Sequence, residues 1–310
     1  MGVEEELAKW SPGKDMLLTI GVFDGVHFGH KYLISRLKEQ AKQQGLLSGM
    51  VTFRQSPQEV LSSGNKRLCL TNLAQRTDLL KNEGVEAIIT LSFTPELAQL
   101  SARKFVSLLK KYLRLKELVI GSDFALGRNR EGNSDTLRTL GQNMDFTVIV
   151  VPPVEINGEV VSSTAIRKIL IKGDMKRVHN LIGRYFSLSG RVISGVGRGI
   201  ELGFPTANLE IAPEQVLPPD GVYATWVYIG DKVYQSMTDI GKNPTFCGSE
   251  RTMEVYVLDY QGNLYGDELK IDLVERFRDE IRFDTVEELK KQIAEDVKQG
   301  RAILNSRGRN

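Results

Sequence analysis

The sequence has few cysteines and few histidines. Its 310 residues include two cysteines, Cys69 and Cys247, which lack the spacing of metal ligands, and three histidines. Cysteines so few and so widely separated argue against a disulfide framework and favour a reducing compartment. No apolar run approaches the roughly 18 residues of a membrane span, and the acidic segment 2–6 is unlike a signal peptide. We therefore expect a cytoplasmic protein with no membrane partner.

An excess of charge of one sign is also missing. The 41 basic and 39 acidic residues leave a net charge of +2. Proteins that bind nucleic acid concentrate Lys and Arg against its phosphates, so this balance predicts no nucleic-acid partner. The chain also lacks a Gly-x-x-x-x-Gly-Lys-Ser/Thr segment, which excludes a P-loop mechanism. The composition leaves the oligomeric state open.

The first half of the chain predicts an α/β domain. Apolar strands are expected at 17–23, 50–53, 87–91, 118–121 and 146–151. Helices are expected between them at 31–44, at 101–113, and from an N-cap at Thr71 to Asn82. Continuous apolar strands separated by helices are typical of a Rossmann-like parallel sheet covered on both faces. Ligands of such sheets bind at the carboxyl ends of the strands.

The pattern changes after Arg184. Shorter and often alternating strands are expected at 186–193, 222–229, 232–240, 253–258 and 269–274. Alternation with frequent turn residues predicts a small antiparallel barrel. One helix from Thr285 to about Ile303 closes it, with a capping box of Thr285 and Glu288, and the basic tail 301–310 is expected to fray. We therefore predict two domains, at 1–182 and 183–310.

His27 and His30 form the first candidate site. They lie in Gly21-Val22-Phe23-Asp24-Gly25-Val26-His27-Phe28-Gly29-His30, where the first strand leads into a helix. Three residues apart on a helix, the two imidazoles share one face. The helix N-terminus offers free N–H groups to a phosphate, and Gly25 and Gly29 let it approach the backbone. The motif predicts a phosphate site; the alternative is a pair of surface histidines.

A second candidate anion site follows the last strand of this half. The segment Ser162-Ser163-Thr164-Ala165-Ile166-Arg167 stands just before a helix. Hydroxyls at a helix N-terminus, with an arginine one turn later, can bind phosphate oxygens. The alternative is an ordinary helix cap beside a solvated arginine.

The second half carries a glycine-rich motif of a different kind. Gly195-Val196-Gly197-Arg198-Gly199 leads on to Leu202-Gly203-Phe204-Pro205-Thr206-Ala207-Asn208. The glycines make a loop that can close over a nucleotide. Thr206 and Asn208 lie two residues apart on one face of an extended segment, and their oxygens suit Mg²⁺.

A carboxylate inside an apolar strand is the candidate catalytic base. Enzymes that phosphorylate an alcohol use a carboxylate to orient the hydroxyl or accept its proton. Glu254 lies in Thr252-Met253-Glu254-Val255-Tyr256, and Asp259 at the end of that strand is the competing candidate. The alternative for Glu254 is a solvent-facing strand charge.

With these motifs, the chain resembles the bacterial bifunctional riboflavin kinase/FAD synthetase (FMN adenylyltransferase) family from about Leu17 to Ile303. The matching segments are 21–30, 119–132, 162–167, 183–186, 195–208, 241–246, 254–259, 264–266 and 277–283. The resemblance implies a C-terminal six-stranded β-barrel that phosphorylates riboflavin to FMN. It also implies an N-terminal nucleotidyltransferase-like α/β domain that adenylylates FMN to FAD and releases pyrophosphate. ATP, Mg²⁺ and the flavins are the expected ligands.

The resemblance also implies roles for individual residues. His27 and His30 contact the ATP phosphates, Glu254 is the kinase base, and Thr206 and Asn208 serve the metal. The remaining nucleotide-binding residues are Gly21, Phe23, Asp24, Gly25, Gly29, Ser163, Thr164, Arg167, Gly195, Gly197, Gly203 and Pro205. The flavin-binding residues are Phe53, Asp123 and Arg278.

The sequence departs from the family pattern in a loop on the flavin side. The family has Phe-x-Pro-His-Pro where this chain has Phe53-Arg54-Gln55-Ser56-Pro57, and Leu126 stands in place of a second aromatic. Two alternatives to the bifunctional enzyme stay open. One is a riboflavin kinase whose N-terminal half is weak or takes another acceptor; the other is a flavin- or nucleotide-binding regulator without turnover.

Overall fold

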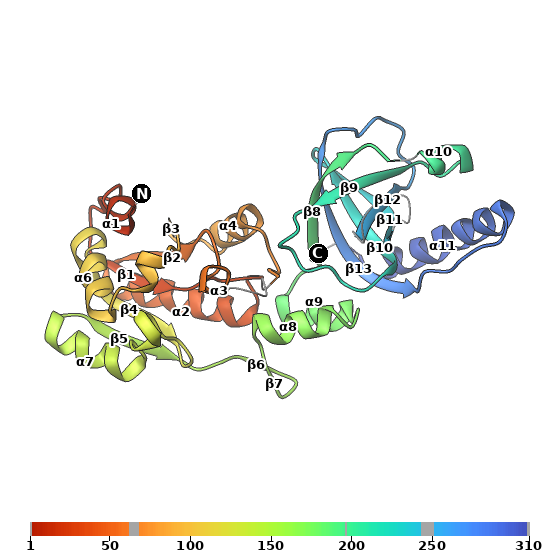
Figure 1. Cartoon of the computed structure of the whole chain (residues 1–310). Helices are drawn as coiled ribbons and strands as arrows, with labels where there is room; N and C mark the ends of the chain where they lie inside the picture. Colours follow the sequence, from red (N-terminus) through yellow and green to blue (C-terminus); the bar gives the residue numbers. More distant parts are fainter. Residues whose placement is uncertain (1, 62–67, 196, 243–250, 309–310) are drawn as a thin grey trace. The chain divides into compact units, whose positions relative to one another are not determined.

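The computed structural model describes residues 2–61, 68–195, 197–242 and 251–308 (Figure 1). The chain divides into two units, Met1–Ser163 and Thr164–Asn310. Both predicted fold classes are confirmed, because the first unit contains a parallel sheet and the second a closed antiparallel barrel. The first unit ends before residue 182, so the domain boundary predicted there stays a prediction.

The sheet of the first unit has the strand order β3-β2-β1-β4-β5, and every neighbouring pair is parallel. Its strands are β1 (Met16–Ile20), β2 (Leu47–Phe53), β3 (Ala87–Leu91), β4 (Leu115–Gly121) and β5 (Thr147–Val151). The strand order reverses beside β1, because β2 and β3 extend to one side of it and β4 and β5 to the other. In open parallel sheets a ligand binds at such a switch point, beyond the carboxyl ends of the strands.

Helices cover both faces of this sheet. Leu17 packs with Leu37 of α2 (Phe28–Gln44) on one face, and Leu18 packs with Leu109 of α6 (Ala102–Leu113) on the other. α4 (Leu73–Asn82) lies on the α2 face. α1 (Val3–Leu7) and α7 (Ser134–Met144) contribute to the core on the α6 face. The shorter elements are α3 (Pro57–Leu61), α5 (Pro95–Ala98), η1 (Arg128–Arg130), β6 (Glu155–Ile156) and β7 (Glu159–Val160).

The barrel of the second unit closes in the order β10-β11-β12-β9-β8-β13. Its strands are β8 (Phe186–Ile193), β9 (Thr206–Ile211), β10 (Gly221–Ile229), β11 (Lys232–Lys242), β12 (Arg251–Val257) and β13 (Glu268–Arg278). The extended segment expected to carry Thr206 and Asn208 is thus the strand β9. Three helices precede or interrupt the barrel strands: α8 (Ser163–Leu170), α9 (Met175–Ile182) and α10 (Arg198–Leu202).

The two faces of the barrel strands differ. Ala224 and Met237 pack with Leu304 of α11 (Val286–Arg307), so their face is the outer one. Residues at the alternate positions point inward, where the buried hydroxyls of Thr225 and Ser236 lie 2.7 Å apart. Inward-facing polar groups therefore satisfy one another, and the outer face is open to other partners where α11 does not cover it.

The prediction of a frayed basic tail is wrong. α11 continues to Arg307, and its Leu304 is buried against the barrel. Arg301 donates to Asp259 at 2.7 Å, and Arg307 donates to Glu275 at 2.6 Å. These two ion pairs and the buried Leu304 hold the last turns of α11 against the barrel.

Three local predictions also need correction. The N-cap of α4 is Asn72 and not Thr71, since the Thr71 hydroxyl accepts from Gly25 N at 3.0 Å. Thr285 caps α11 as predicted, but Glu288 accepts from Asp284 N at 3.3 Å, so the capping box is shifted by one residue. The segment predicted to precede a helix at 162–167 lies within α8 from Ser163 onward.

Among the residues that the structure describes, no helix combines the length and the apolar character of a membrane span.

Candidate active sites

The loop between β1 and α2 has a strained backbone. Phe23 and Val26 have φ of 55° and 38°, and Gly25 has φ of 82°. Positive φ is costly for a β-branched residue, and such strain is retained where the surrounding structure enforces it, often at ligand sites. A Cβ on Gly25 would lie 2.7 Å from Leu70. Gly25 is therefore required by its own φ and by Leu70, and its close approach to a phosphate stays a prediction.

Asp24 ties this loop to two distant segments. Its buried carboxylate accepts from the backbone N–H of Leu70 at 2.9 Å and of Thr71 at 3.0 Å. Its main-chain oxygen accepts from Ser163 Oγ at 2.8 Å. The carboxylate thus shapes the loop, and a direct contact of Asp24 with a nucleotide stays a prediction.

His27 and His30 lie together at the start of α2, as predicted. Their rings stack with centroids 3.7 Å apart at 18°, and Phe23 meets His30 edge-on at 5.3 Å. His27 is buried and is the N-cap of α2, with Nδ1 accepting from His30 N at 3.4 Å. A neutral His27 that accepts at Nδ1 carries its proton on Nε2, which can donate to a phosphate oxygen. A Cβ on Gly29 would lie 3.2 Å from the His27 ring, so glycine there keeps the ring in place.

The two predicted flavin contacts of this unit flank β1 in the sheet. Phe53 ends β2, and its ring meets Phe93 edge-on at 5.4 Å. Asp123 follows β4 and is exposed, and its main-chain oxygen accepts from Arg130 at 3.0 Å. Arg76 of α4 is buried and donates to the Phe53 main-chain oxygen, and burial lowers the pKa of its guanidinium. No pattern in the sequence points to Arg76, because a cation in an amphipathic helix is usually exposed.

The two remaining predicted anion-binding residues belong to the second unit. Thr164 and Arg167 lie on α8, and only Ser163 falls in the first unit. Ser163 is joined to the loop between β1 and α2 through the main-chain oxygen of Asp24. The predicted cooperation of Thr164 and Arg167 with His27 stays a prediction.

The predicted kinase residues lie together on the outer face of the barrel. Asn208 of β9 pairs with Glu254 of β12, and Thr206 pairs with Tyr256. Tyr256 pairs in turn with Met237 under α11, which fixes the face as the outer one. Thr206 Oγ1 donates to Glu254 Oε2 at 3.1 Å. The structure thus brings the predicted base and both predicted metal ligands to one patch.

The glycine-rich loop packs against these side chains. A Cβ on Gly195 would lie 2.1 Å from Asn208 Nδ2, and a Cβ on Gly199 would lie 3.1 Å from Thr206 Oγ1. Gly197 and Gly203 have φ of 77° and 87° and flank α10. Glycine is therefore needed at these points by contact or by conformation. Val196 lies outside the described residues, and Pro205 joins the loop to β9.

The donor set here fits Mg²⁺ better than a transition metal. Thr206, Asn208 and Glu254 offer only hard oxygen donors, and Mg²⁺ binds through few such groups while keeping waters and sharing phosphate oxygens. Among the described residues, no cluster of three or more His, Cys, Asp or Glu side chains could hold a metal.

Arg278 and Asp259 each form an ion pair with a side chain of α11. Arg278 makes a bidentate pair with Asp296 of α11, with Nε–Oδ1 at 2.8 Å and Nη2–Oδ2 at 2.6 Å. Its predicted contact with the flavin stays a prediction. Asp259 pairs with Arg301 at 2.7 Å and is largely exposed, whereas Glu254 contacts Thr206. This favours Glu254 over Asp259 as the base.

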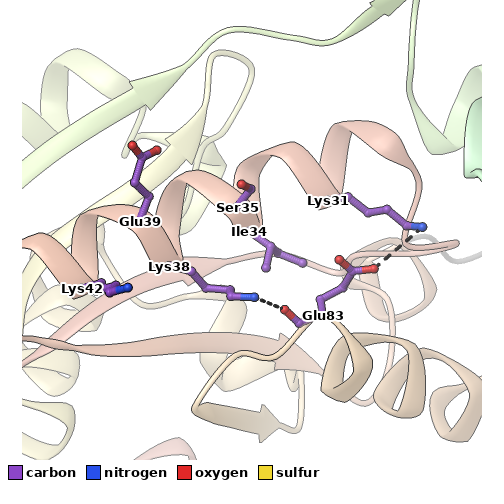
Figure 2. Close-up of a pocket in the computed structure, with 7 residues that line it drawn as sticks. All are labelled: Lys31, Ile34, Ser35, Lys38, Glu39, Lys42 and Glu83. Atoms are coloured by element: carbon purple, nitrogen blue, oxygen red, sulfur yellow. Dashed lines mark hydrogen bonds and ion pairs between the residues drawn. The ribbon is translucent and has the colours of Figure 1, made fainter.

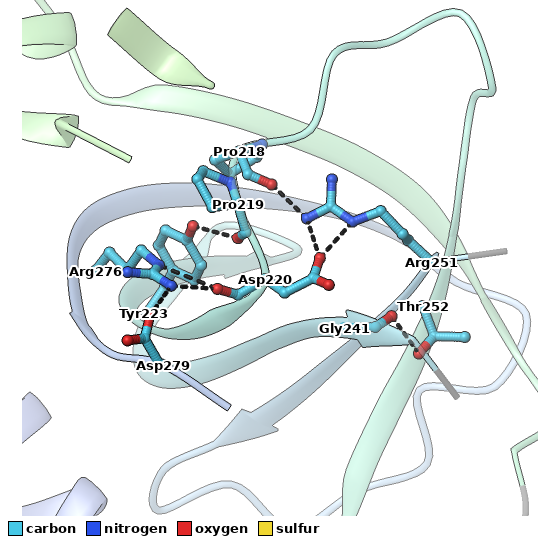
Figure 3. Close-up of polar contacts among 9 residues, drawn as sticks. All are labelled: Pro218, Pro219, Asp220, Tyr223, Gly241, Arg251, Thr252, Arg276 and Asp279. Carbon is cyan, nitrogen blue, oxygen red and sulfur yellow. Dashed lines mark hydrogen bonds and ion pairs between the residues drawn. The ribbon is translucent and has the colours of Figure 1, made fainter. Parts of the chain in front are cut away.

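Two arginines, Arg251 of β12 and Arg276 of β13, clamp Asp220 just before β10 at one end of the barrel (Figure 3). Arg251 Nε donates to the Asp220 carboxylate at 2.6 Å, and Arg276 Nε donates to the Asp220 main-chain oxygen at 3.1 Å. Tyr223 is buried there and donates to the Pro219 main-chain oxygen at 2.6 Å, and burial raises its pKa. The clamp ties the segment just before β10 to the start of β12 and to β13.

An open recess of about 450 Å³ lies elsewhere, on α2 (Figure 2). Three lysines of α2 line it, and two of them engage Glu83: Lys38 donates to the Glu83 main-chain oxygen at 2.6 Å, and Lys31 Nζ lies 3.8 Å from its carboxylate. None of the predicted site residues line this recess.

The strained loop between β1 and α2 at a switch point of the sheet, and the patch of Glu254, Thr206 and Asn208 under a glycine-rich loop, fit a two-domain nucleotide-dependent transferase. Sequence models agree: that of FAD synthetase matches residues 11–165, and that of riboflavin kinase matches residues 182–304. The chain belongs to the family of bifunctional riboflavin kinase/FMN adenylyltransferases. It is 36% identical to the protein of that name from Escherichia coli K12, over 95% of this chain and 94% of the relative.

Other relatives agree in length as well as in sequence. The bifunctional riboflavin kinase/FMN adenylyltransferase of Pseudomonas fluorescens is 37% identical over 92% of each chain. A solved structure titled as a macrolide-efflux protein from Streptococcus pneumoniae superimposes with a TM-score of 0.87 at 33% identity, covering 95% of this chain and 96% of that one. Segment 241–246, one of those that match the family pattern in sequence, extends past Lys242 into residues that the structure does not describe.

Proposed function

We propose that this chain phosphorylates riboflavin to FMN in its barrel and then adenylylates FMN to FAD in its α/β unit. The observation that carries the proposal is the Glu254 patch, where the candidate base and two hard oxygen donors lie under a glycine-rich loop. A barrel with a merely structural role would not need a carboxylate and two glycine contacts at one point.

In the kinase, Glu254 takes the proton of the terminal riboflavin hydroxyl. That oxygen attacks the γ-phosphorus of ATP, the bond to the bridging oxygen of ADP breaks, and FMN forms. Gly195, Gly197, Gly203 and Pro205 shape the loop that covers the nucleotide, and Arg278 holds the flavin side. Mg²⁺, bound by Thr206 and Asn208, would supply charge neutralisation for the phosphates when present.

In the adenylyltransferase, the FMN phosphate attacks the α-phosphorus of ATP, and pyrophosphate leaves. The protein forms no covalent bond in this scheme, so its contribution is positioning and charge stabilisation. His27 and His30 donate to the phosphates, supported by Gly21, Phe23, Asp24, Gly25 and Gly29. Ser163, Thr164 and Arg167 hold the pyrophosphate end, and Phe53 and Asp123 hold the flavin.

We place the functional boundary near Ile182, because the riboflavin kinase match begins there. The cytoplasmic location and the lack of a nucleic-acid partner stay predictions.

The test is incubation of the full chain with riboflavin, ATP and Mg²⁺, with FMN and FAD resolved by chromatography. Formation of both products supports the proposal. FMN alone would favour a kinase with an altered N-terminal half, and the loop at Gln55-Ser56 would then be the first place to look. The absence of both products would favour a flavin-binding regulator.

A further inference from the structure

A row of directly opposed residues, most of them polar, crosses the outer face of the barrel and extends beyond the candidate kinase residues. Register places Asn208 opposite Glu254, and Glu254 opposite Asp239 of β11. The row continues through Val222 of β10 to Arg278 of β13. Directly opposed residues on neighbouring strands project to the same face. Asp239 is therefore the next side chain along from the candidate base.

Carboxylates outnumber cations along this row. A Cβ on Gly241, two residues after Asp239 on the same face of β11, would lie 1.5 Å from Glu280 Oε1, so Glu280 packs over that glycine. Arg278 is already held by Asp296. No described residue donates a hydrogen bond to the Asp239 carboxylate, which is exposed. A carboxylate beside a reacting centre without a protein donor is suited to accept one from a ligand.

The electrostatics support this description. Removal of water by the surrounding protein, together with the nearby carboxylates of Glu280, Glu254 and Asp296, raises the pKa of Asp239 to about 7 against the opposing effect of Arg278. Solvent reaches the exposed carboxylate and screens part of this effect. A surface of this kind disfavours another anion and favours a neutral ligand with O–H donors.

We propose that Asp239 accepts a hydrogen bond from an inner hydroxyl of the ribityl chain of riboflavin and so positions the terminal hydroxyl beside Glu254. This rests on the proposed kinase function. Neighbouring strands lie about 4.8 Å apart, which an extended carbon chain covers in about four bonds of ~1.5 Å. With its terminal hydroxyl at Glu254, a ribityl chain laid across the strands therefore brings an inner hydroxyl over Asp239.

The experiment compares riboflavin with a flavin analogue whose side chain keeps only the terminal hydroxyl. The variants are Asp239→Ala, Asp239→Asn and a control, Asp231→Ala, whose residue lies in the turn just before β11. All three are made in the full chain, and kcat and KM of phosphorylation are measured for both acceptors. Loss of one charge-assisted hydrogen bond should lower kcat/KM of Asp239→Ala for riboflavin roughly tenfold to a hundredfold. Asp239→Asn, which keeps an acceptor, should lose less, and the control should match the natural chain.

The analogue decides the outcome. If Asp239 contacts an inner hydroxyl, Asp239→Ala should change kcat/KM for the analogue by no more than about twofold, since the contact is already missing. Equal losses for both acceptors, or no loss for riboflavin, would overturn the inference. Failure of the natural chain to phosphorylate riboflavin would overturn the proposed kinase function itself.

Folding is monitored separately through the melting temperature. The folded pKa of Asp239, about 7, lies above its unfolded value, so the charged form costs stability that is lost as the pH rises from the unfolded pKa to about 7, and the loss is complete above that pH. Both Asp239 variants should therefore melt at or above the temperature of the natural chain at about pH 8. A lower melting temperature would assign Asp239 a structural role and contradict the inference.

Discussion

The stacked pair at the start of α2 allows catalysis to be separated from helix capping. His27 is both the N-cap of α2 and the proposed phosphate donor, so His27→Ala removes two functions at once. Asparagine is among the best N-cap residues and has no imidazole. We therefore predict that His27→Asn retains the cap and loses the catalysis, whereas His27→Ala loses both.

The magnitudes follow from the geometry. The capping bond is long, at 3.4 Å, so its loss should cost at most about 0.5–1 kcal/mol. That corresponds to a fall of roughly 1–4 °C in the melting temperature of a unit of this size. Loss of one preorganised donor to the phosphates should slow FAD formation about 10²–10³-fold in both variants.

The assay supplies FMN, ATP and Mg²⁺ and follows FAD by chromatography, with FMN formation from riboflavin as the internal control. Both variants should form FMN at the natural rate, and only His27→Ala should melt early. FAD synthesis by His27→Asn within about threefold of the natural chain would refute the reasoning, because His27 would then act only as a cap. A covalent adenylyl group trapped on His27 or His30 would refute the proposed mechanism.

The remaining predictions concern other parts of the two sites. Glu254→Gln should lower kcat of the kinase about 10²–10⁴-fold while FAD formation from supplied FMN continues, and a loss under tenfold would exclude it as the base. Asp24→Asn should destabilise the first unit by about 1–3 kcal/mol, because an amide N–H₂ would face backbone N–H groups; an unchanged melting temperature would contradict the role assigned to its carboxylate. A fragment of residues 164–310 should melt at a higher temperature than one of residues 184–310, because α9 packs on the barrel, and equal melting would show that the helix is dispensable.

The regular elements could be predicted from the sequence because their signals are local. β3 (Ala87–Leu91) and β8 (Phe186–Ile193) have the predicted bounds, since apolar runs and alternation end at turn residues. The N-cap of α4 could not be assigned in this way. Thr71 and Asn72 both suit an N-cap, and the choice depends on Gly25, which lies far away in the sequence and engages the Thr71 hydroxyl.

The site residues were predictable only where a motif carries them. Glu254, Thr206 and Asn208 lie in recognisable segments, and the structure brings them together. Asp239 has no such signal, because it lies beside Glu254 only through the register of β11 against β12. That register cannot be read from the sequence of residues 232–257. The hydrogen bonds that the Asp24 carboxylate accepts from Leu70 and Thr71 likewise could not be predicted, because they depend on the tertiary fold.

The central claim is that two successive reactions use different phosphates of ATP. The most direct test incubates the full chain with riboflavin, Mg²⁺ and ATP radiolabelled on either its γ- or its α-phosphate. The account predicts that γ-label enters FMN and is retained in FAD, whereas α-label enters FAD alone, with one pyrophosphate released per FAD. Failure of γ-label to enter FMN, or entry of α-label into FMN, would contradict it.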